Sequence, residues 1–179
     1  MRKFGILITA IAFLLISMNI CGAVERNEFA LGGVNLGNSY DDVIKMYGQP
    51  TSHPGGYSQM VSDVIIYNGV EIGFLGKKVR YVVTTKNNGW TTPSGVCVGM
   101  SIDDVIKIYG TDYSTQIRTK NDIPKWMLES DKKYYDYTWT GKKYTWKHFV
   151  SNEFTLGLSV VENDGKITAV MIQQFTPEN

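Results

Sequence analysis

GVNLGNSYDDVIKMYGQPTS, from Gly33 to Ser52, and GVCVGMSIDDVIKIYGTDYS, from Gly95 to Ser114, are two versions of one stretch. They lie 62 residues apart, and 12 of their 20 aligned positions are identical. Identity this dense within one chain indicates an internal repeat. We therefore predict two tandem modules, residues 24–91 and residues 92–179.

Each copy of the stretch is predicted to form a short capped helix. Ser39 and Ser101 stand at the N-cap position, and Asp42 and Asp104 follow three residues later, in an Asp version of the capping box. Apolar residues recur at helical spacing and form one stripe per helix: Tyr40, Val43, Ile44 and Tyr47, then Ile102, Val105, Ile106 and Tyr109. A helix of about two turns does not persist alone, so each helix must pack on a sheet.

Alternating apolar and polar residues, separated by turn residues, predict strands after each helix. The first copy contains three such segments: 57–67, 70–75 and 79–85. The second contains four: 134–140, 144–150, 154–161 and 166–175. The predicted fold class is therefore α+β, with two tandem modules that each pack a short capped helix on an antiparallel β-meander.

The N-terminus has the features of a secretory signal peptide. Arg2 and Lys3 precede an apolar run from Phe4 to Ile20, and small residues follow up to Ala23. We predict a signal peptide at residues 1–23 with cleavage after Ala23, and hence a periplasmic or secreted protein. Two alternatives remain open: an uncleaved membrane anchor, because the run nearly spans a bilayer, and a lipid anchor on Cys21.

Composition excludes some classes of partner and gives no sign of a cofactor. The full chain has 18 basic and 17 acidic residues, so no global nucleic-acid partner is expected. After cleavage Cys97 is the single cysteine, so we expect no internal disulfide. Membrane contact is expected only if the signal is uncleaved or lipidated.

Candidate catalytic and metal-binding residues have simpler explanations. Cys97 could pair with His53 or His148 as a nucleophile, but a plain buried cysteine is the favoured interpretation. Helix capping accounts for the four paired aspartates, Asp41, Asp42, Asp103 and Asp104. We therefore predict no catalytic residues and no metal site.

Two segments outside the repeat have predicted structural roles. Residues 24–28 are expected to be a short, mobile polar lead. Residues 87–94 surround Trp90 with Asn, Gly, Thr and Pro, and are expected to connect the modules.

The second copy carries an insertion, residues 113–133, that the first lacks. A hairpin around Gly141 and Lys142 would then pair Trp139 with Tyr144, Tyr137 with Trp146, and Tyr135 with His148 on one face. That aromatic face is either core under the helix or an exposed platform for a partner. The candidate binding residues are Trp126, Tyr135, Tyr137, Trp139, Tyr144 and Trp146.

The repeated motif resembles a known fold. The matching residues are Gly37, Ser39, Val43, Tyr47, Gly48 and Pro50, then Gly99, Ser101, Val105, Tyr109 and Gly110. This pattern resembles the tandem-repeat beta-lactamase-inhibitor-like fold, and is similar to small lipoproteins of the outer-membrane assembly machinery. The resemblance covers about 40 residues and implies a non-enzymatic binder of protein or envelope components.

The sequence therefore predicts an exported, non-enzymatic binding or envelope-associated module that recognises a protein partner in the envelope or outside the cell. Two alternatives remain: a cell-wall glycan binder that uses an aromatic platform, and a Cys-dependent hydrolase.

Overall fold

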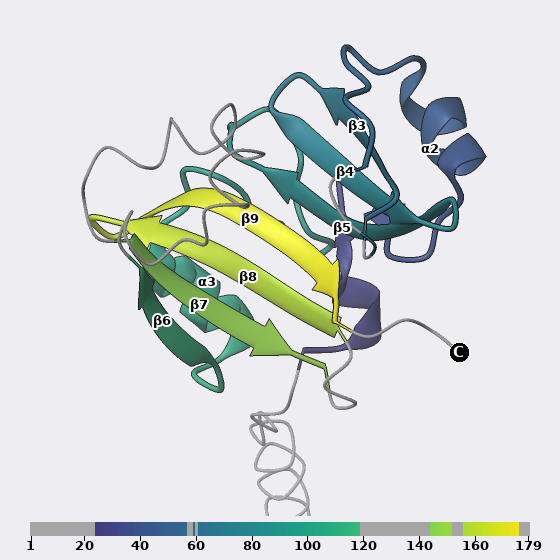
Figure 1. The fold of residues 1–179 in the computed structure, drawn as a ribbon. Coiled ribbons are helices and arrows are strands. Elements are labelled where there is room, and N and C mark those ends of the chain that lie inside the picture. The colour runs from purple at the N-terminus through teal and green to yellow at the C-terminus, as the bar shows by residue number, and fades with distance from the viewer. Residues whose placement is uncertain (1–23, 57–58, 60, 119–143, 152–155, 176–179) are drawn as a thin grey trace, which may run out of the picture.

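The computed structural model describes residues 24–56, 59, 61–118, 144–151 and 156–175. Its main feature is a seven-stranded antiparallel sheet in the order β3-β4-β5-β9-β8-β7-β6 (Figure 1). The strands are β3 (Asp63–Tyr67), β4 (Val70–Leu75), β5 (Lys78–Thr84), β6 (Ser114–Arg118), β7 (Tyr144–Val150), β8 (Leu156–Asn163) and β9 (Lys166–Gln174). With two α-helices beside this sheet, the fold class is α+β, as predicted.

The two predicted helices form where the caps place them. They are α2 (Tyr40–Tyr47) and α3 (Ile102–Tyr109). Ser39 accepts a hydrogen bond from the Asp42 backbone N–H at 3.1 Å, and Ser101 does the same for Asp104 at 3.2 Å. The Ser39 hydroxyl and the Ser39 backbone N–H both donate to the Asp42 carboxylate. These hydrogen bonds lower the pKa of Asp42, the one from the hydroxyl more than the one from the backbone. No helix among the described residues is long and apolar enough to cross a membrane.

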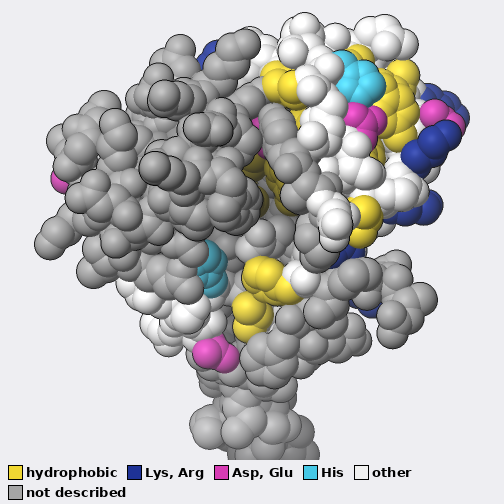
Figure 2. Space-filling model, viewed as in Figure 1, with side chains coloured by type: hydrophobic (Ala, Val, Ile, Leu, Met, Phe, Trp, Pro, Cys, Tyr) yellow, Lys and Arg dark blue, Asp and Glu magenta, His cyan; other side chains and the backbone are white. Residues whose placement is uncertain are grey.

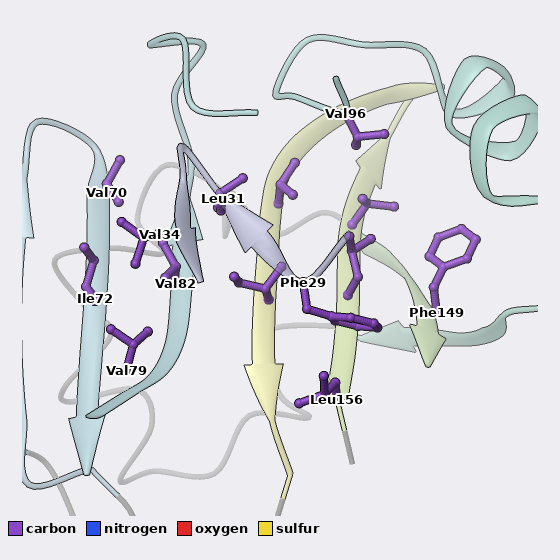
Figure 3. Close-up of a cluster of buried hydrophobic side chains, with 14 of the residues drawn as sticks. Phe29, Leu31, Val34, Val70, Ile72, Val79, Val82, Val96, Phe149 and Leu156 are labelled. Carbon is purple, nitrogen blue, oxygen red and sulfur yellow. The ribbon is translucent and has the colours of Figure 1, made fainter. Parts of the chain in front are cut away.

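Both helices cover one face of the sheet together with an N-terminal hairpin. This hairpin follows the 3-10 helix η1 (Arg26–Glu28) and consists of β1 (Ala30–Leu31) and β2 (Val34–Asn35). Figure 3 shows Phe29 and Leu31 among side chains from strands on both sides of the β5–β9 pair. Val43 of α2 and Val105 of α3 are fully buried in the same cluster. Removing this apolar surface from water is the main driving force for folding.

Repeat-related positions make matching contacts with β5 and β9. The Gly37 N–H donates to Val79 O at 2.9 Å, and the Gly99 N–H donates to Ile167 O at 2.8 Å. The pairing register also shifts after Gly73 in one half and after Val161 in the other, 88 positions apart. We call residues 24–85 the first half and the described residues from 86 onward the second half. This boundary differs from the predicted one after residue 91, and it places Trp90 in the second half, 62 positions after Glu28.

One row of residues crosses the whole sheet on the face opposite the helices. From edge to edge the paired residues are Ser52, Ile66, Glu71, Val83, Met171, Ser159, His148 and Ser114. Ser52 and Ser114 are the final residues of the two copies of the repeat. Each half therefore begins its pairing from the same repeat position, at opposite edges of the sheet.

Three expectations need correction. The strand predicted at 57–67 begins at Asp63, and residues 114–118 of the predicted insertion form β6. The N-terminal lead is held in place, because Val24 is buried and its N–H donates to Val150 O at 3.2 Å. The apolar Val24 and the hydrogen-bonding Glu28 make residues 24–28 part of the fold.

The strand partner predicted for residues 144–148 is also wrong. Strand β7 pairs with β6 along one edge, where His148 lies opposite Ser114 and Trp146 opposite Gln116. Its other edge pairs with β8 from Thr145 to Val150. Both edges of β7 are therefore paired with β6 and β8, and the predicted partners, residues 135–139, lie outside the described residues.

Candidate binding groove

A groove of about 510 Å³ lies where the two halves meet. The N-terminal hairpin, the C-terminal end of α2 and a connecting segment, residues 88–95, contribute its walls. The lining residues are Ala30, Gly32, Gly33, Tyr47, Asn88, Gly89, Trp90, Thr91, Thr92 and Pro93. This volume is within the range of small-ligand pockets, which also suits an anchoring side chain of a partner.

An aromatic pair forms one side of the groove. The rings of Tyr47 and Trp90 stack with centroids 4.5 Å apart and an interplanar angle of 26°. The Tyr47 hydroxyl donates to the carbonyl oxygen of Gly32, and burial raises the Tyr47 pKa. Gly32 has φ +59°, and a Cβ there would collide with the Trp90 ring. The stack is therefore built into the fold, while 38% of Tyr47 remains exposed.

The far end of the connecting segment is fixed by a polar network. The Glu28 carboxylate accepts from the Ser94 N–H at 3.1 Å, the Ser94 hydroxyl at 2.9 Å and the Tyr109 hydroxyl at 2.7 Å. The Tyr109 hydroxyl also lies 2.7 Å from Thr92 Oγ1. Burial is the main cause of the raised pKa of Tyr109, so this phenol stays protonated at physiological pH.

The chemistry of the groove is neutral. Among its described lining residues no side chain is a carboxyl, an amine or an imidazole. The side-chain amide of Asn88 donates to the backbone oxygen of Asn68 at 2.9 Å, and Asn88 Oδ1 accepts from the backbone N–H of Trp90 at 3.3 Å. Thr92 Oγ1 also accepts from the Val96 N–H at 3.1 Å. The lining side chains thus offer one aromatic pair, Tyr47 and Trp90, and no acid–base group. In Figure 2, lysine and arginine side chains of the described residues gather mainly on the side where α2 lies.

Other polar pairs lie away from the groove. Glu71 is buried on the opposite sheet face, where burial raises its pKa and the Tyr81 hydroxyl donates to its carboxyl group. On the same face, His148 Nδ1 lies 2.8 Å from Ser159 Oγ. His53 Nε2 lies 2.6 Å from Asp63 Oδ1 near the β3 edge.

The sequence-predicted site falls largely outside the described residues. Trp126, Tyr135, Tyr137 and Trp139 belong to that undescribed part, while Tyr144 and Trp146 are placed by their backbone in β7. Their role in binding stays a prediction.

Cys97 is half-buried, whereas the sequence favoured a plain buried cysteine. It precedes α3 on the helix side, whereas His148 lies on the opposite face of the sheet. Among the described residues no group of three His, Cys, Asp or Glu side chains could hold a metal ion.

Sequence reasoning missed Trp90 and Glu28 as site residues. The sequence predicts a connector around Trp90 and a mobile lead around Glu28. Yet the two residues are 62 positions apart, the spacing of the repeat. At this spacing residues 28–32 and 90–94 share no identical residue, so the repeat gives no sequence signal for either position.

No protein-family model and no curated protein matches the chain. One similar solved structure is an extracellular protein containing a SCP domain from Bacillus anthracis str. Ames, with a TM-score of 0.48 and 11% identity. Another is a cysteine-rich secretory protein from Staphylococcus aureus subsp. aureus Mu50, also at 0.48 and 11%. The matches cover 78% and 86% of this chain, but only 44% and 49% of those proteins. The chain thus spans less than half the length of these structures.

These comparisons correct the resemblance drawn from the repeated motif. The proteins matched are SCP-domain and cysteine-rich secretory proteins, so the assignment to the tandem-repeat beta-lactamase-inhibitor-like fold is wrong. The motif misled because its residues satisfy local needs. Ser39 caps a helix and Gly48, at φ +74°, ends it, and many folds share such helices.

Proposed function

We propose that this chain is an exported, non-enzymatic binding module that recognises a protein partner in the cell envelope or outside the cell. The groove carries the proposal, because it is neutral, has an exposed aromatic residue and is assembled from both halves. Export is supported by the basic start, apolar run and small residues of the first 23 positions.

We also propose that the two halves are related modules joined edge to edge through β5 and β9. Matching hydrogen bonds from Gly37 and Gly99 support this relation, as do the register shifts 88 positions apart. On this proposal the groove is a site that a single module would lack, because Tyr47 and Trp90 come from different halves.

The lining favours an uncharged anchor on the partner. Tyr and Trp are enriched at protein interfaces and contribute large binding energies once desolvated. A charged anchor would lose its hydration without finding a counter-charge here. A sugar needs several free hydrogen-bonding groups, but Asn88 and Thr92 are already hydrogen-bonded within the chain. A protein anchor is therefore preferred to the glycan alternative.

The test places a charged side chain at the exposed rim. Pro93→Glu adds a carboxylate to the groove, and Pro54→Glu adds the same group at an exposed proline away from it. Mature protein immobilised as bait would capture a partner from the envelope fraction of the exporting cell. The partner would then be identified and purified, and its Kd measured with both variants.

We expect Pro93→Glu to weaken Kd about tenfold or more, and Pro54→Glu to leave it within about twofold. Equal Kd values for both variants would exclude the groove as the contact site. Capture of cell-wall polysaccharide, lost in Pro93→Glu alone, would replace the protein partner with the glycan alternative.

A further inference from the structure

The tyrosines that end the two helices contact the same repeat position, each in the opposite half. Tyr47 of the first half stacks on Trp90 of the second, and Tyr109 of the second half binds Glu28 of the first. Tyr47 and Tyr109 are 62 residues apart, and so are Glu28 and Trp90. The contacts are therefore exchanged between the halves.

Both exchanged contacts act on the connecting segment, which forms a wall of the groove. At its start, Trp90 is held by Tyr47, and Thr91 O accepts from the Gly32 N–H at 2.9 Å. Further along, Thr92 is bound to Tyr109 and Ser94 to Glu28. The exposed rim residue Pro93 lies between these last two attachments.

We propose that Glu28 and Tyr109 are positioning residues of the groove. Neither residue lines the groove. Their hydrogen bonds fix Thr92 and Ser94, and thereby set the distance between the connecting segment and the N-terminal hairpin. This inference rests on the proposed function for the use of the groove, but its geometry is independent of any partner.

The proposal predicts an effect at a distance. The hydrogen bonds of Glu28 go to Ser94 and Tyr109, whereas Gly32 holds the start of the connecting segment through Thr91. If the two attachments act together, loss of the Glu28 carboxylate must loosen both ends. If Glu28 only caps a local turn, the loss must stop at Ser94.

Amide hydrogen exchange of the full mature chain tests this difference, with Glu28→Ala as the variant. The Ser94 amide loses its acceptor, and its exchange should accelerate about tenfold. We expect the Gly32 amide to exchange at least about threefold faster and the Trp90 indole resonance to shift. Glu28→Gln retains an acceptor oxygen and should partly restore both. Glu25→Ala changes an exposed residue beside the same 3-10 helix and should match the wild type.

Acceleration at Ser94 with an unchanged Gly32 amide and Trp90 resonance would overturn the proposal. Should Glu28→Ala fail to fold, Tyr109→Phe removes the phenol hydroxyl while leaving Glu28 bound to Ser94, and the same two signals decide. A Pro93→Glu variant that keeps its partner affinity, in a protein where Glu28→Ala loosens Gly32, would reject the proposed function but not this inference.

Discussion

Tyr47 and Tyr109 occupy the same position in the two copies of the repeat, yet they do different things. Each is the last residue of its helix and is followed by a glycine with positive φ. Tyr47 remains 38% exposed and stacks on Trp90 at the groove. Tyr109 hydrogen-bonds Glu28 and Thr92. The comparison teaches that the local sequence determines the helix. The residue of the opposite half then determines whether the terminal tyrosine stacks on a ring, as Tyr47 does, or donates to a carboxylate, as Tyr109 does.

The largest expected effect on stability comes from replacing Gly32 with serine, the residue at the matching position of the second half, Ser94. Gly32→Ser places a side chain against the Trp90 ring at φ +59°, and should lower the free energy of unfolding by about 3 kcal/mol. Urea denaturation measures this. Gly33→Ala, where an added Cβ meets nothing within 4 Å, should cost only about 1 kcal/mol. Equal losses would show that Trp90 does not press on Gly32.

The next effect separates the two tyrosines directly. Tyr109→Phe removes a hydrogen bond to a carboxylate and another to Thr92, and should lower the free energy of unfolding by about 2 kcal/mol. Tyr47→Phe removes one bond to a carbonyl group and should cost about 1 kcal/mol. Both values come from urea denaturation at neutral pH. A larger loss for Tyr47→Phe would reverse the comparison.

A third difference between the halves is tested by pH. Glu71 and its counterpart 88 positions later, Ser159, lie in the same cross-sheet row. Because burial raises the pKa of folded Glu71 above its ordinary value of 4.5, the folded state favours the protonated acid. Its stabilisation is present below that ordinary value and is lost as pH rises through the folded-state pKa.

Glu71→Gln should therefore be more stable than the wild type at neutral pH, by about 1 kcal/mol. The difference should shrink towards pH 4, as thermal unfolding at several pH values would show. Glu25→Gln, which makes the same change at an exposed residue, is the matched control. An advantage that is constant with pH would rule out the titration of Glu71 as its cause.

The aromatic residues peculiar to the second half give a smaller expected effect on stability. If Tyr137 and Trp146 form a second contact surface, Tyr137→Ala and Trp146→Ala should each change stability by less than about 0.5 kcal/mol and still reduce partner capture. Melting temperature and capture are measured on the same samples. Losses of about 3–5 kcal/mol would instead identify these residues as core.

The smallest effect is expected at Cys97, whose repeat counterpart is Asn35. Cys97→Ser should alter neither partner affinity nor, by more than about 0.5 kcal/mol, the free energy of unfolding. A hydrolase that uses this thiol would lose its activity in the same variant. Hydrolysis of envelope ester or amide substrates by wild type alone would therefore contradict the binding-module proposal.

The sequence predicted the local elements well. Strands β4 and β7 have the predicted bounds, and both helices lie between Ser N-caps and glycines, because capping and alternation are local properties. The pairing of β7 was mispredicted, because nearness in sequence favoured residues 135–139 over β6. Register between strands depends on which edges other strands occupy, and that is a property of the whole sheet.

The candidate site was harder to predict than the elements. The sequence indicated Tyr47 as one apolar position in a helical stripe and Trp90 as part of a connector. Their stacking depends on Gly32 leaving space for the indole and on the connecting segment passing over the N-terminal hairpin. A contact between residues 43 positions apart has no periodic signature in the chain.

The sequence by itself determined the repeat, the capped helices, most strand positions and the α+β class, because each follows from propensities and spacings within a few residues. Only the tertiary structure decided that β5 pairs with β9, that Val24 and Glu28 belong to the fold, and that Tyr47 and Tyr109 contact residues of the opposite half. The physical reason is that pairing and packing depend on surfaces brought together from distant parts of the chain. Two nearly identical helices can therefore end in one tyrosine that stacks on an indole ring and one that donates to a carboxylate.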